Sequence, residues 1–408
     1  MTIAPSREEL LEQAYRRLSD ALPDKPWIKY LKKVSASKKK PPAIDVLGDN
    51  LILHGLDLWE HRSTRKLDKY DQRNIAEALF YCAKFIQITD SMTPIRRVRA
   101  LAKFKGAFGK PGAIRAMIFE TFIFHALKGR GFSVECKDDD VGPDRYDFLV
   151  TDKGQELQVE CKSFAYDKGL SVTSKEANDL ASEVLNKNLD VHRNSEGEVC
   201  FATVELRRNI ARSKTGKENL VESIVQSLSG DGSEEDERYR ITIDRVDYGD
   251  DIENWKGVLD FPERGAGIEL ARLEMAANGK KSRFCLRVTT TTTDAFWREF
   301  ENVCKFAAKQ QLGTDRSSII ALHISNIDSL EAIVGDSRFH SKMRNVFHQP
   351  HITRLILVAN IDICEQNEAP YFILYPIIKE FPNNDAKFPN TGTLITSLEW
   401  SGQVIDKL

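Results

Sequence analysis

A polar turn between two strand-like segments is the feature that most constrains this chain. Residues 146–150 and 156–162 each read as a strand, and the four residues Thr151-Asp152-Lys153-Gly154 between them are polar and include a glycine. This pattern predicts a β-hairpin. An aspartate stands at the start of the first strand and a Glu-x-Lys triplet near the end of the second, so the hairpin would gather two acids and a base.

The second strand has two chemically different faces. Successive side chains of an extended segment alternate between faces, so Gln158, Glu160 and Lys162 share one face and the apolar residues between them share the other. We expect the apolar face to pack on the core and the polar face to be the working side, that is, the face whose side chains take part in the chemistry.

Two carboxylates and an ammonium together suit the hydrolysis of a phosphodiester. That reaction requires neutralisation of developing negative charge and activation of a water molecule. Hard divalent cations such as Mg²⁺ serve both purposes and prefer carboxylate and carbonyl oxygens as ligands. Asp147, Glu160 and Lys162 meet that demand.

The tetrapeptide Val-Glu-Cys-Lys occurs twice, at residues 134–137 and at residues 159–162. With 29% charged residues, an isolated Glu-x-Lys triplet is expected by chance and usually marks a solvated strand face. Only the second copy follows a strand that carries an aspartate. The context therefore assigns the chemistry to the second copy.

A third acid lies earlier in the chain, within a segment from Ala113 to Lys128 that reads as a helix. Glu120 sits there in an apolar run at residues 117–124, where burial of an unpaired carboxylate would be costly. We expect a cation or a basic partner beside Glu120. Alternatively, Glu120 pairs with Arg115, or its carboxylate is exposed to solvent.

In this order of elements the chain resembles the PD-(D/E)XK nuclease superfamily, in its restriction-endonuclease-like and Holliday-junction-resolvase-like branches. The resemblance rests on the Glu120 helix, the strands 132–136 and 146–151, and the Glu160-Cys161-Lys162 strand. It extends over residues 113–207, where a helix at 173–187 and a strand at 198–206 complete the core contiguously. The implied fold is α/β, with a restriction-endonuclease-like αβββαβ core and a mixed central sheet.

The resemblance also implies roles for the residues. Asp147 and Glu160 would bind Mg²⁺ directly, with Mn²⁺ as a substitute, and the backbone carbonyl of Cys161 would be a further metal ligand. Lys162 would orient or deprotonate the attacking water. Glu120 would bind a second metal ion or act through water.

Two assignments stay open at this point. Pro143-Asp144 precedes Asp147 by three residues, so Asp144 is an alternative ligand, although Asp147 directly precedes the apolar strand. In a rival layout, the helix containing residues 309–312 and the strand from Ile319 complete the core. Much of 165–290 would then be an insertion.

A basic stretch leads into the Glu120 helix. No acidic residue occurs from Ser91 to Phe119, and glycines and phenylalanines are interspersed among the basic residues. This stretch predicts a phosphate-contacting surface, and the plainer alternative is a solvated basic helix face. The predicted nucleic-acid-binding residues are Arg96, Arg97, Arg99, Lys103, Lys105, Lys110 and Arg115.

The rest of the chain suggests three domains. Residues 1–112 show helical periodicity and predict an α-helical N-terminal domain, and residues 208–408 predict a C-terminal α/β domain with strands at 284–288, 319–324, 355–359 and 371–378. The formal net charge of −2 means that nucleic-acid binding would depend on local patches. Seven cysteines without a Cys-x-x-Cys pair, and no long apolar span, indicate a cytoplasmic protein without a membrane anchor.

The leading expectation is a Mg²⁺-dependent DNA endonuclease of a restriction or phage-defence system. Neither Gly-Lys pair is followed by the Ser or Thr of a nucleotide-binding loop, so a partner with helicase, ATPase or recognition activity is a further expectation. A homodimer would allow both DNA strands to be cut. The alternatives are a repair or recombination nuclease for structured or single-stranded nucleic acid, including RNA, and an inactive binding or scaffold protein with the same fold.

Overall fold

The chain forms two compact units. The first comprises Met1–Ser37, Val46–Ala165 and Phe300–Leu408, and the second, which we call the inserted unit, comprises Lys38–Asp45 and Tyr166–Glu299. The computed structural model describes residues 6–37, 51–65, 67, 69–137, 146–165, 179–180, 183–184, 187, 198–207, 214–229, 234–247, 267–277, 280–290, 294–325, 330–359, 363–365, 372–374 and 376–388.

Helices make up the N-terminal part of the first unit, as the sequence predicts. They are α1 (Arg7–Ala21), α2 (Pro26–Ser37), α3 (Leu51–Glu60), α4 (Lys69–Asp90), α5 (Pro94–Ala107) and α6 (Pro111–Gly129). Ser6 and Glu9 form a capping box at the start of α1, and Pro94 and Pro111 open α5 and α6, where a missing N–H has no cost.

The predicted hairpin is present. Strands β2 (Phe148–Asp152) and β3 (Gln155–Ala165) pair antiparallel with Asp152 opposite Gln155, and β1 (Ser133–Cys136) pairs antiparallel with β2. The two turn residues, Lys153 and Gly154, both have positive φ values of 48° and 84°. Positive φ at both central positions is the geometry of a two-residue hairpin turn, which the strand twist favours.

The sheet continues with strands from the C-terminal third of the chain. They are β9 (Ser317–Ser325), β10 (Ile352–Ala359) and β13 (Ile377–Pro382), and the sheet order is β1-β2-β3-β9-β10-β13. Strand β9 runs parallel to both β3 and β10, whereas β13 is antiparallel to β10. A separate antiparallel pair is formed by β11 (Ile363–Glu365) and β12 (Phe372–Leu374). The single strand predicted at 371–378 is therefore divided between β12 and β13.

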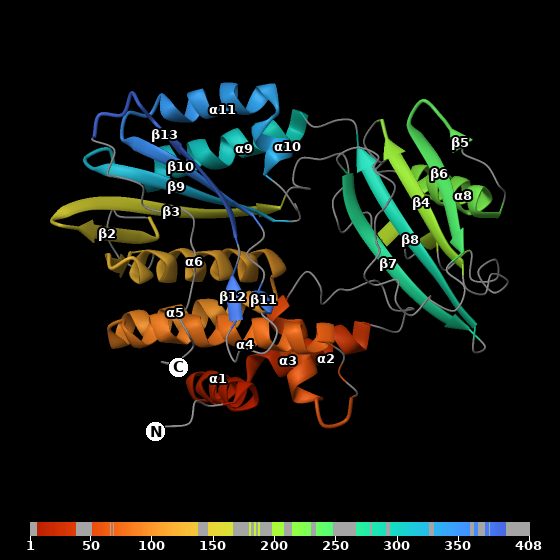
Figure 1. Ribbon diagram of the computed structural model, residues 1–408, viewed down its shortest axis with the longest axis horizontal. Helices are drawn as coiled ribbons and strands as arrows, with labels where there is room; N and C mark the ends of the chain where they lie inside the picture. The colour runs from red at the N-terminus through yellow and green to blue at the C-terminus, as the bar shows by residue number, and fades with distance from the viewer. Residues whose placement is uncertain are drawn as a thin grey trace. The chain divides into compact units, whose positions relative to one another are not determined.

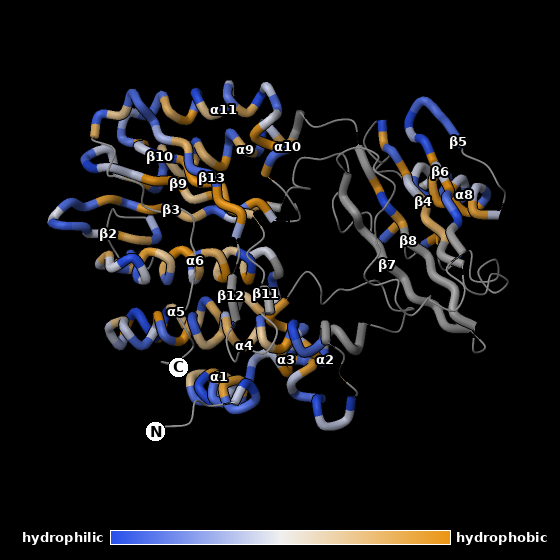
Figure 2. The backbone as a smooth tube through the Cα atoms, viewed as in Figure 1, coloured by the Kyte–Doolittle hydropathy of each residue, from blue (hydrophilic) through white to orange (hydrophobic). Residues whose placement is uncertain are grey.

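Helices cover both faces of this six-stranded sheet (Figure 1). Helix α6 packs on one face, while α11 (Ser337–Phe347) lies on the other, together with α9 (Asp294–Phe306) and its continuation η4 (Ala307–Gln311). The short α10 (Glu331–Val334) precedes α11. Every residue of β9 and β10 is buried, and Figure 2 shows how apolar these strands and α6 are. Parallel strands covered on both faces require this continuous burial.

The N-terminal helices share a hydrophobic core with the sheet. Phe104 of α5, Phe119 of α6, Val159 of β3 and Ile319 of β9 belong to one buried cluster. Helices α1 to α5, which fall within the predicted N-terminal domain at 1–112, therefore belong to the same unit as α6 and the sheet.

The contiguous core predicted for 113–207 differs from the observed topology. Strand β4 (Glu198–Leu206) pairs with strands of the other sheet, and β9 takes the place beside β3. The rival layout, with an insertion after β3, matches this arrangement. The predicted C-terminal domain at 208–408 is likewise divided between the two units. Local periodicity could not distinguish the layouts, because β4 and β9 are both apolar strands.

The inserted unit has its own sheet and core. Its strands are β4, β5 (Glu234–Glu235), β6 (Tyr239–Asp247), β7 (Gly267–Ala277) and β8 (Lys280–Thr290), in the order β5-β6-β4-β8-β7. Helix α8 (Lys214–Ser229) packs on this sheet through Leu220 and Ile224. The predicted helix at 173–187 lies largely outside the described residues, but its Leu180 and Val184 are buried in the same cluster.

Candidate active site

The hairpin brings Asp147 beside the Glu-x-Lys triplet. Asp147 immediately precedes β2, and the pairing of Phe148 with Val159 places it opposite Glu160. Its Oδ2 accepts a hydrogen bond of 2.6 Å from the backbone N–H of Cys161, and only 7% of the residue is exposed. Asp147 is therefore fixed against the residue that stands between Glu160 and Lys162.

Glu160 and Lys162 form an ion pair on β3. The Lys162 ammonium donates a hydrogen bond to Glu160 Oε1, and Glu160 is completely buried whereas the Lys162 side chain is 24% exposed. Burial alone would lower the pKa of Lys162, but the charge and hydrogen bond of Glu160 and the charge of Asp147 outweigh it, so the pKa is raised. Lys162 therefore carries its positive charge at neutral pH in this arrangement.

The Cys161 thiol lies within electrostatic reach of all four predicted catalytic groups. Burial raises its pKa well above the usual value, and the negative charges of Asp147, Glu120 and Glu160 raise it further, while Lys162 opposes them. A thiol with a raised pKa is a poor nucleophile. The structure thus places all four predicted groups within electrostatic range of Cys161, whose own thiol is buried and unreactive.

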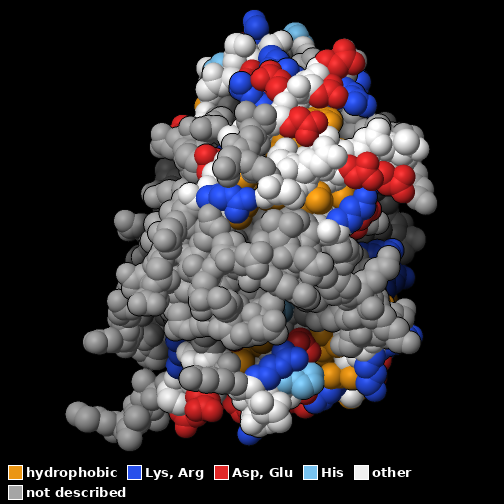
Figure 3. Space-filling view, turned by 90° about the vertical axis from the view of Figure 1, so that its right-hand side faces the viewer, with side chains coloured by type: hydrophobic (Ala, Val, Ile, Leu, Met, Phe, Trp, Pro, Cys, Tyr) orange, Lys and Arg blue, Asp and Glu red, His pale blue; other side chains and the backbone are white. Residues whose placement is uncertain are grey.

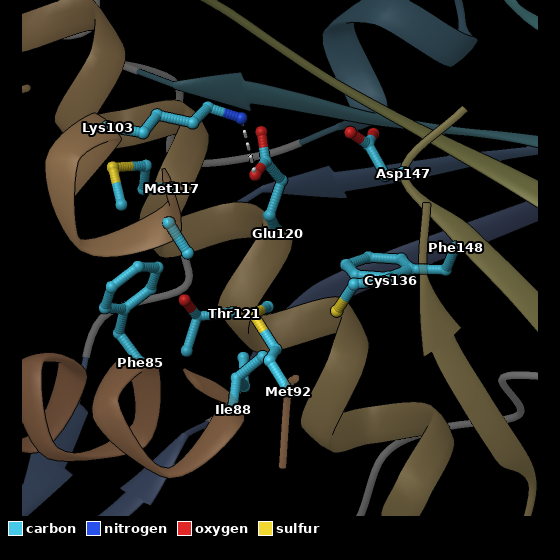
Figure 4. A pocket seen from close by; sticks show the side chains of 11 residues that line it. Phe85, Ile88, Met92, Lys103, Met117, Glu120, Thr121, Cys136, Asp147 and Phe148 are labelled. Carbon is cyan, nitrogen blue, oxygen red and sulfur yellow. Dashed lines mark ion pairs between the residues drawn. The ribbon is translucent and has the colours of Figure 1, made fainter. Parts of the chain in front are cut away.

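Glu120 has the basic partner that its position in an apolar helix predicts. Glu120 Oε2 lies 3.7 Å from the Nζ of Lys103 on α5, and the two side chains are 25% and 46% exposed. Figure 4 shows Lys103 reaching toward Glu120, with Asp147 on the far side of the Glu120 carboxylate. The sequence offered Arg115 as one possible partner of Glu120. In the structure the partner is Lys103, which is one of the predicted phosphate-contacting residues.

A cavity of about 50 Å³ opens beside these charged groups. Lys103, Glu120 and Asp147 are its charged lining residues, and the other lining residues come from α4, the turn after it, α5, α6, β1 and β2 (Figure 4). This volume is sufficient for a few water molecules or a small ion, since one water needs at least about 10–15 Å³. It is too small for a nucleobase.

The two copies of the tetrapeptide have very different surroundings. In the first copy Glu135 is 49% exposed on the edge strand β1, and its carboxylate lies 3.1 Å from Lys137 and 3.3 Å from Arg96. Burial would raise the pKa of Glu135, but these two cations lower it below its usual value. Glu160 of the second copy is completely buried. The first copy is thus a surface ion-pair network, as its context predicted.

The polar face of β3 is more deeply buried than expected. Gln158 is 1% exposed, and its Oε1 accepts hydrogen bonds from Gly313 N at 2.7 Å and Ser318 Oγ at 3.3 Å. At this end of the strand the polar face is covered by β9 and by the loop after η4. Among the charged groups described above, Lys162, Lys103 and Glu120 keep partly exposed side chains.

Sequence reasoning missed a buried histidine next to the site. His323 of β9 pairs in register with Ser163, and its Nδ1 lies 3.1 Å from Ser163 Oγ. The imidazole stacks on Phe119 of α6 with ring centroids 5.2 Å apart. Burial, together with the positive charge of Arg115, lowers the pKa of His323 to about 3. Only the pairing of β9 with β3 reveals this contact, because no motif marks His323.

The buried His323 should make the protein sensitive to acid. Its folded pKa of about 3 lies below the ordinary value of 6.5, so the unfolded chain binds the proton first. Stability should fall as the pH drops below about 6.5, by up to about 1.4 kcal/mol per pH unit, until the folded pKa is reached. Urea unfolding between pH 7 and pH 4 measures this slope. The slope should be smaller in His323→Gln and unchanged in His61→Gln, whose side chain is 50% exposed.

The predicted basic surface is partly neutralised within the protein. Arg97 lies 3.0 Å from Asp90, Lys105 is paired with Asp24, and Arg96 and Lys103 pair with Glu135 and Glu120. Lys110 is exposed and Arg115 is half-buried. On the face drawn in Figure 3, basic and acidic side chains are also interspersed among the described residues. Nucleic-acid binding by this surface stays a prediction.

The predicted metal ligands are Asp147, Glu160, Glu120 and the backbone carbonyl of Cys161. Among the residues that the structure describes, no group of three or more His, Cys, Asp and Glu side chains could hold a metal ion. Asp147, Glu160 and Glu120 each have a protein partner in this conformation. Two carboxylates with a carbonyl still fit Mg²⁺, which uses one or two carboxylates and keeps several waters. Asp144, the alternative ligand, lies outside the described residues.

The sequence matches no model of a known protein family and no curated protein. Among the described helices, none is long and apolar enough to cross a membrane.

Proposed function

We propose that the protein is a metal-dependent nuclease that hydrolyses phosphodiester bonds of DNA, with a PD-(D/E)XK type of site on a restriction-endonuclease-like core. The observation that carries the proposal is the hydrogen bond from the Cys161 amide to Asp147. It joins an acid at the start of one strand to the centre of Glu160-Cys161-Lys162 on the next. This is the juxtaposition that the sequence resemblance requires.

The order of elements supports the proposal. Helix α6 is followed by the antiparallel strands β1, β2 and β3, and after the inserted unit come the helix α9 and the parallel strand β9. This order matches αβββαβ with an insertion before the second helix. Because many activities share one fold, the functional argument rests on the site rather than on the topology.

The chain's own residues have distinct roles in this proposal. Asp147 and Glu160 would hold a Mg²⁺ ion with the Cys161 carbonyl, and a bound ion of this kind lowers the pKa of water and neutralises developing charge. Lys162 would orient the attacking water and stabilise the negative charge of the phosphate through its ammonium. The burial of Glu160 strengthens these interactions, since charges interact more strongly away from bulk water.

The substrate and the biological setting are further parts of the proposal. We propose a restriction or phage-defence endonuclease, with a partner that supplies recognition or motor activity. The basic helix α5, which reaches the site through Lys103, supports a nucleic-acid substrate. A repair or recombination nuclease would use the same acids on structured or single-stranded substrates.

One assay separates these possibilities. Purified protein is incubated with Mg²⁺ or Mn²⁺ and with duplex, flap, junction, single-stranded DNA and RNA, and products are resolved on denaturing gels. We expect cleavage that requires the metal ion and is blocked by EDTA. Preference for duplex DNA favours a restriction-type enzyme, and preference for flaps or junctions favours repair. Cleavage that persists in EDTA would contradict the metal-dependent proposal.

A binding or scaffold protein is the second candidate. It is favoured by the two ion pairs, Glu160 with Lys162 and Glu120 with Lys103, which already neutralise two of the three acids without a metal ion. This candidate predicts no binding of Mn²⁺ in isothermal titration calorimetry. Mn²⁺ binding that disappears in Asp147→Asn would exclude it.

A further inference from the structure

The contact between Lys103 and Glu120 joins the basic helix to the acidic site. At 3.7 Å between Nζ and Oε2 it is an ion pair without a hydrogen bond, since the distance exceeds the usual hydrogen-bonding range. Both side chains line the cavity together with Asp147, and both are partly exposed to solvent. The pair is therefore accessible to an ion or a phosphate that enters from solution.

The other two acids are held differently. Asp147 is bound by the backbone amide of Cys161, and Glu160 is bound by Lys162 two residues along the same strand. Both contacts lie within the hairpin. Glu120 pairs with a cation from a separate helix, α5, in a stretch of sequence without any acidic residue.

We propose that Lys103 is a positioning residue that couples the binding of DNA to the binding of the metal ion. In the protein without DNA, the Lys103 ammonium holds Glu120 and competes with a divalent cation for its carboxylate. A DNA phosphate that pairs with Lys103 releases Glu120 toward the cation. The inference rests on the proposed nuclease function and assigns a regulatory step to the same site.

Elementary electrostatics gives the direction of the effect. The Lys103 ammonium and a divalent cation repel one another and compete for the Glu120 carboxylate. Each therefore weakens the binding of the other to that carboxylate. A DNA phosphate attracts both. By linkage, a phosphate that strengthens metal binding must itself be bound more tightly in the presence of the metal ion. Divalent ions alone would then occupy the site weakly, and DNA and metal ion would bind together.

The test compares Lys103→Gln with the wild-type protein. The amide is shorter by one methylene group and carries no charge, so the affinity for Mn²⁺ without DNA should rise on the order of fivefold in calorimetry. The matched control is Lys379→Gln on β13, whose ammonium likewise forms an ion pair, at 2.8 Å from Glu331. Its affinity for Mn²⁺ should equal that of the wild-type protein.

A double-mutant cycle then tests whether Glu120 transmits the effect. In a Glu120→Gln background, Lys103→Gln should no longer change the affinity for Mn²⁺, because the shared carboxylate is gone. In a Lys162→Ala background, where cleavage is blocked, a short DNA duplex should raise the affinity for Mn²⁺. The additional change Lys103→Gln should remove most of that increase.

The outcomes distinguish this inference from the proposed function. Wild-type protein that binds Mn²⁺ through Asp147, together with an unchanged affinity in Lys103→Gln, overturns the role of Lys103 alone. If Lys103→Gln still raises the affinity for Mn²⁺ in the Glu120→Gln background, the role of Lys103 is overturned as well. Lys103 would then act only as a general positive charge. Failure of every form to bind Mn²⁺ overturns both the metal-dependent function and the coupling.

Discussion

Replacing Lys162 with Met is expected to reduce metal-dependent cleavage of DNA by about 10²- to 10⁴-fold, the range for loss of a group that acts in the transition state. The ammonium contacts Glu160, which is completely buried, and only the ammonium end can stabilise a developing negative charge. Cleavage rates under single-turnover conditions, with enzyme in excess over DNA, measure the effect.

The twin tetrapeptide provides a matched control for this change. Lys137→Met removes the same ammonium from the same four-residue sequence on β1, where Lys137 pairs with the half-exposed Glu135. Its cleavage rate should equal that of the wild-type protein. Lys162→Met also leaves Glu160 buried without this cation, which lowers the stability of the fold. Thermal unfolding of the variant is therefore measured. Glu160→Gln serves as a second variant. Full activity in both Lys162→Met and Glu160→Gln would exclude this site.

Replacing Asp147 with Asn should lower the affinity for Mn²⁺ by more than about 100-fold. Loss of a residue that only orients a metal ligand costs about 10- to 100-fold in affinity, and loss of a direct ligand should cost more. The Asn side chain has an oxygen that can still accept the hydrogen bond from the Cys161 amide, so the hairpin should keep its geometry. The charge that attracts the cation is lost. Calorimetric titration with Mn²⁺ measures the change.

Asp152→Asn is the matched control for this second change. Asp152 lies at the other end of β2, beside the hairpin turn, and pairs with Gln155. The same chemical change there should leave the affinity for Mn²⁺ and the cleavage rate unaltered. If Asp147→Asn binds Mn²⁺ as tightly as the wild-type protein, Asp147 is not a metal ligand, and Asp144 becomes the candidate to test.

The local parts of the site could be predicted because they depend on neighbours in the sequence. The glycine-containing turn at Lys153 and Gly154 determines the hairpin, and the hairpin places Asp147 beside Cys161. The need of Glu120 for a basic partner followed from the cost of burying a carboxylate in an apolar helix. These inferences used only alternation, turn chemistry and desolvation.

The non-local parts could not be predicted with the same principles. The parallel pairing of β3 with β9 brings Glu160 opposite Ile320 and Ser163 opposite His323, across the whole of the inserted unit. The residues of β3 and β9 do not determine which strand pairs with which, since any buried apolar strand could pair with β3. The burial of Gln158 and the stacking of His323 follow from this pairing, and sequence reasoning missed both.

The insertion between β3 and β9 also has a consequence for the synthesis of the protein. The strand that carries Glu160 and Lys162 acquires its parallel neighbour only after the inserted unit has been translated, because β9 follows that unit in the chain. Contacts so distant in sequence form late and slowly during folding. A ribosome-bound or truncated chain that lacks β9 would therefore carry the acids and the lysine on an incomplete sheet. The cell would be exposed to an assembled site only after the ribosome had translated β9.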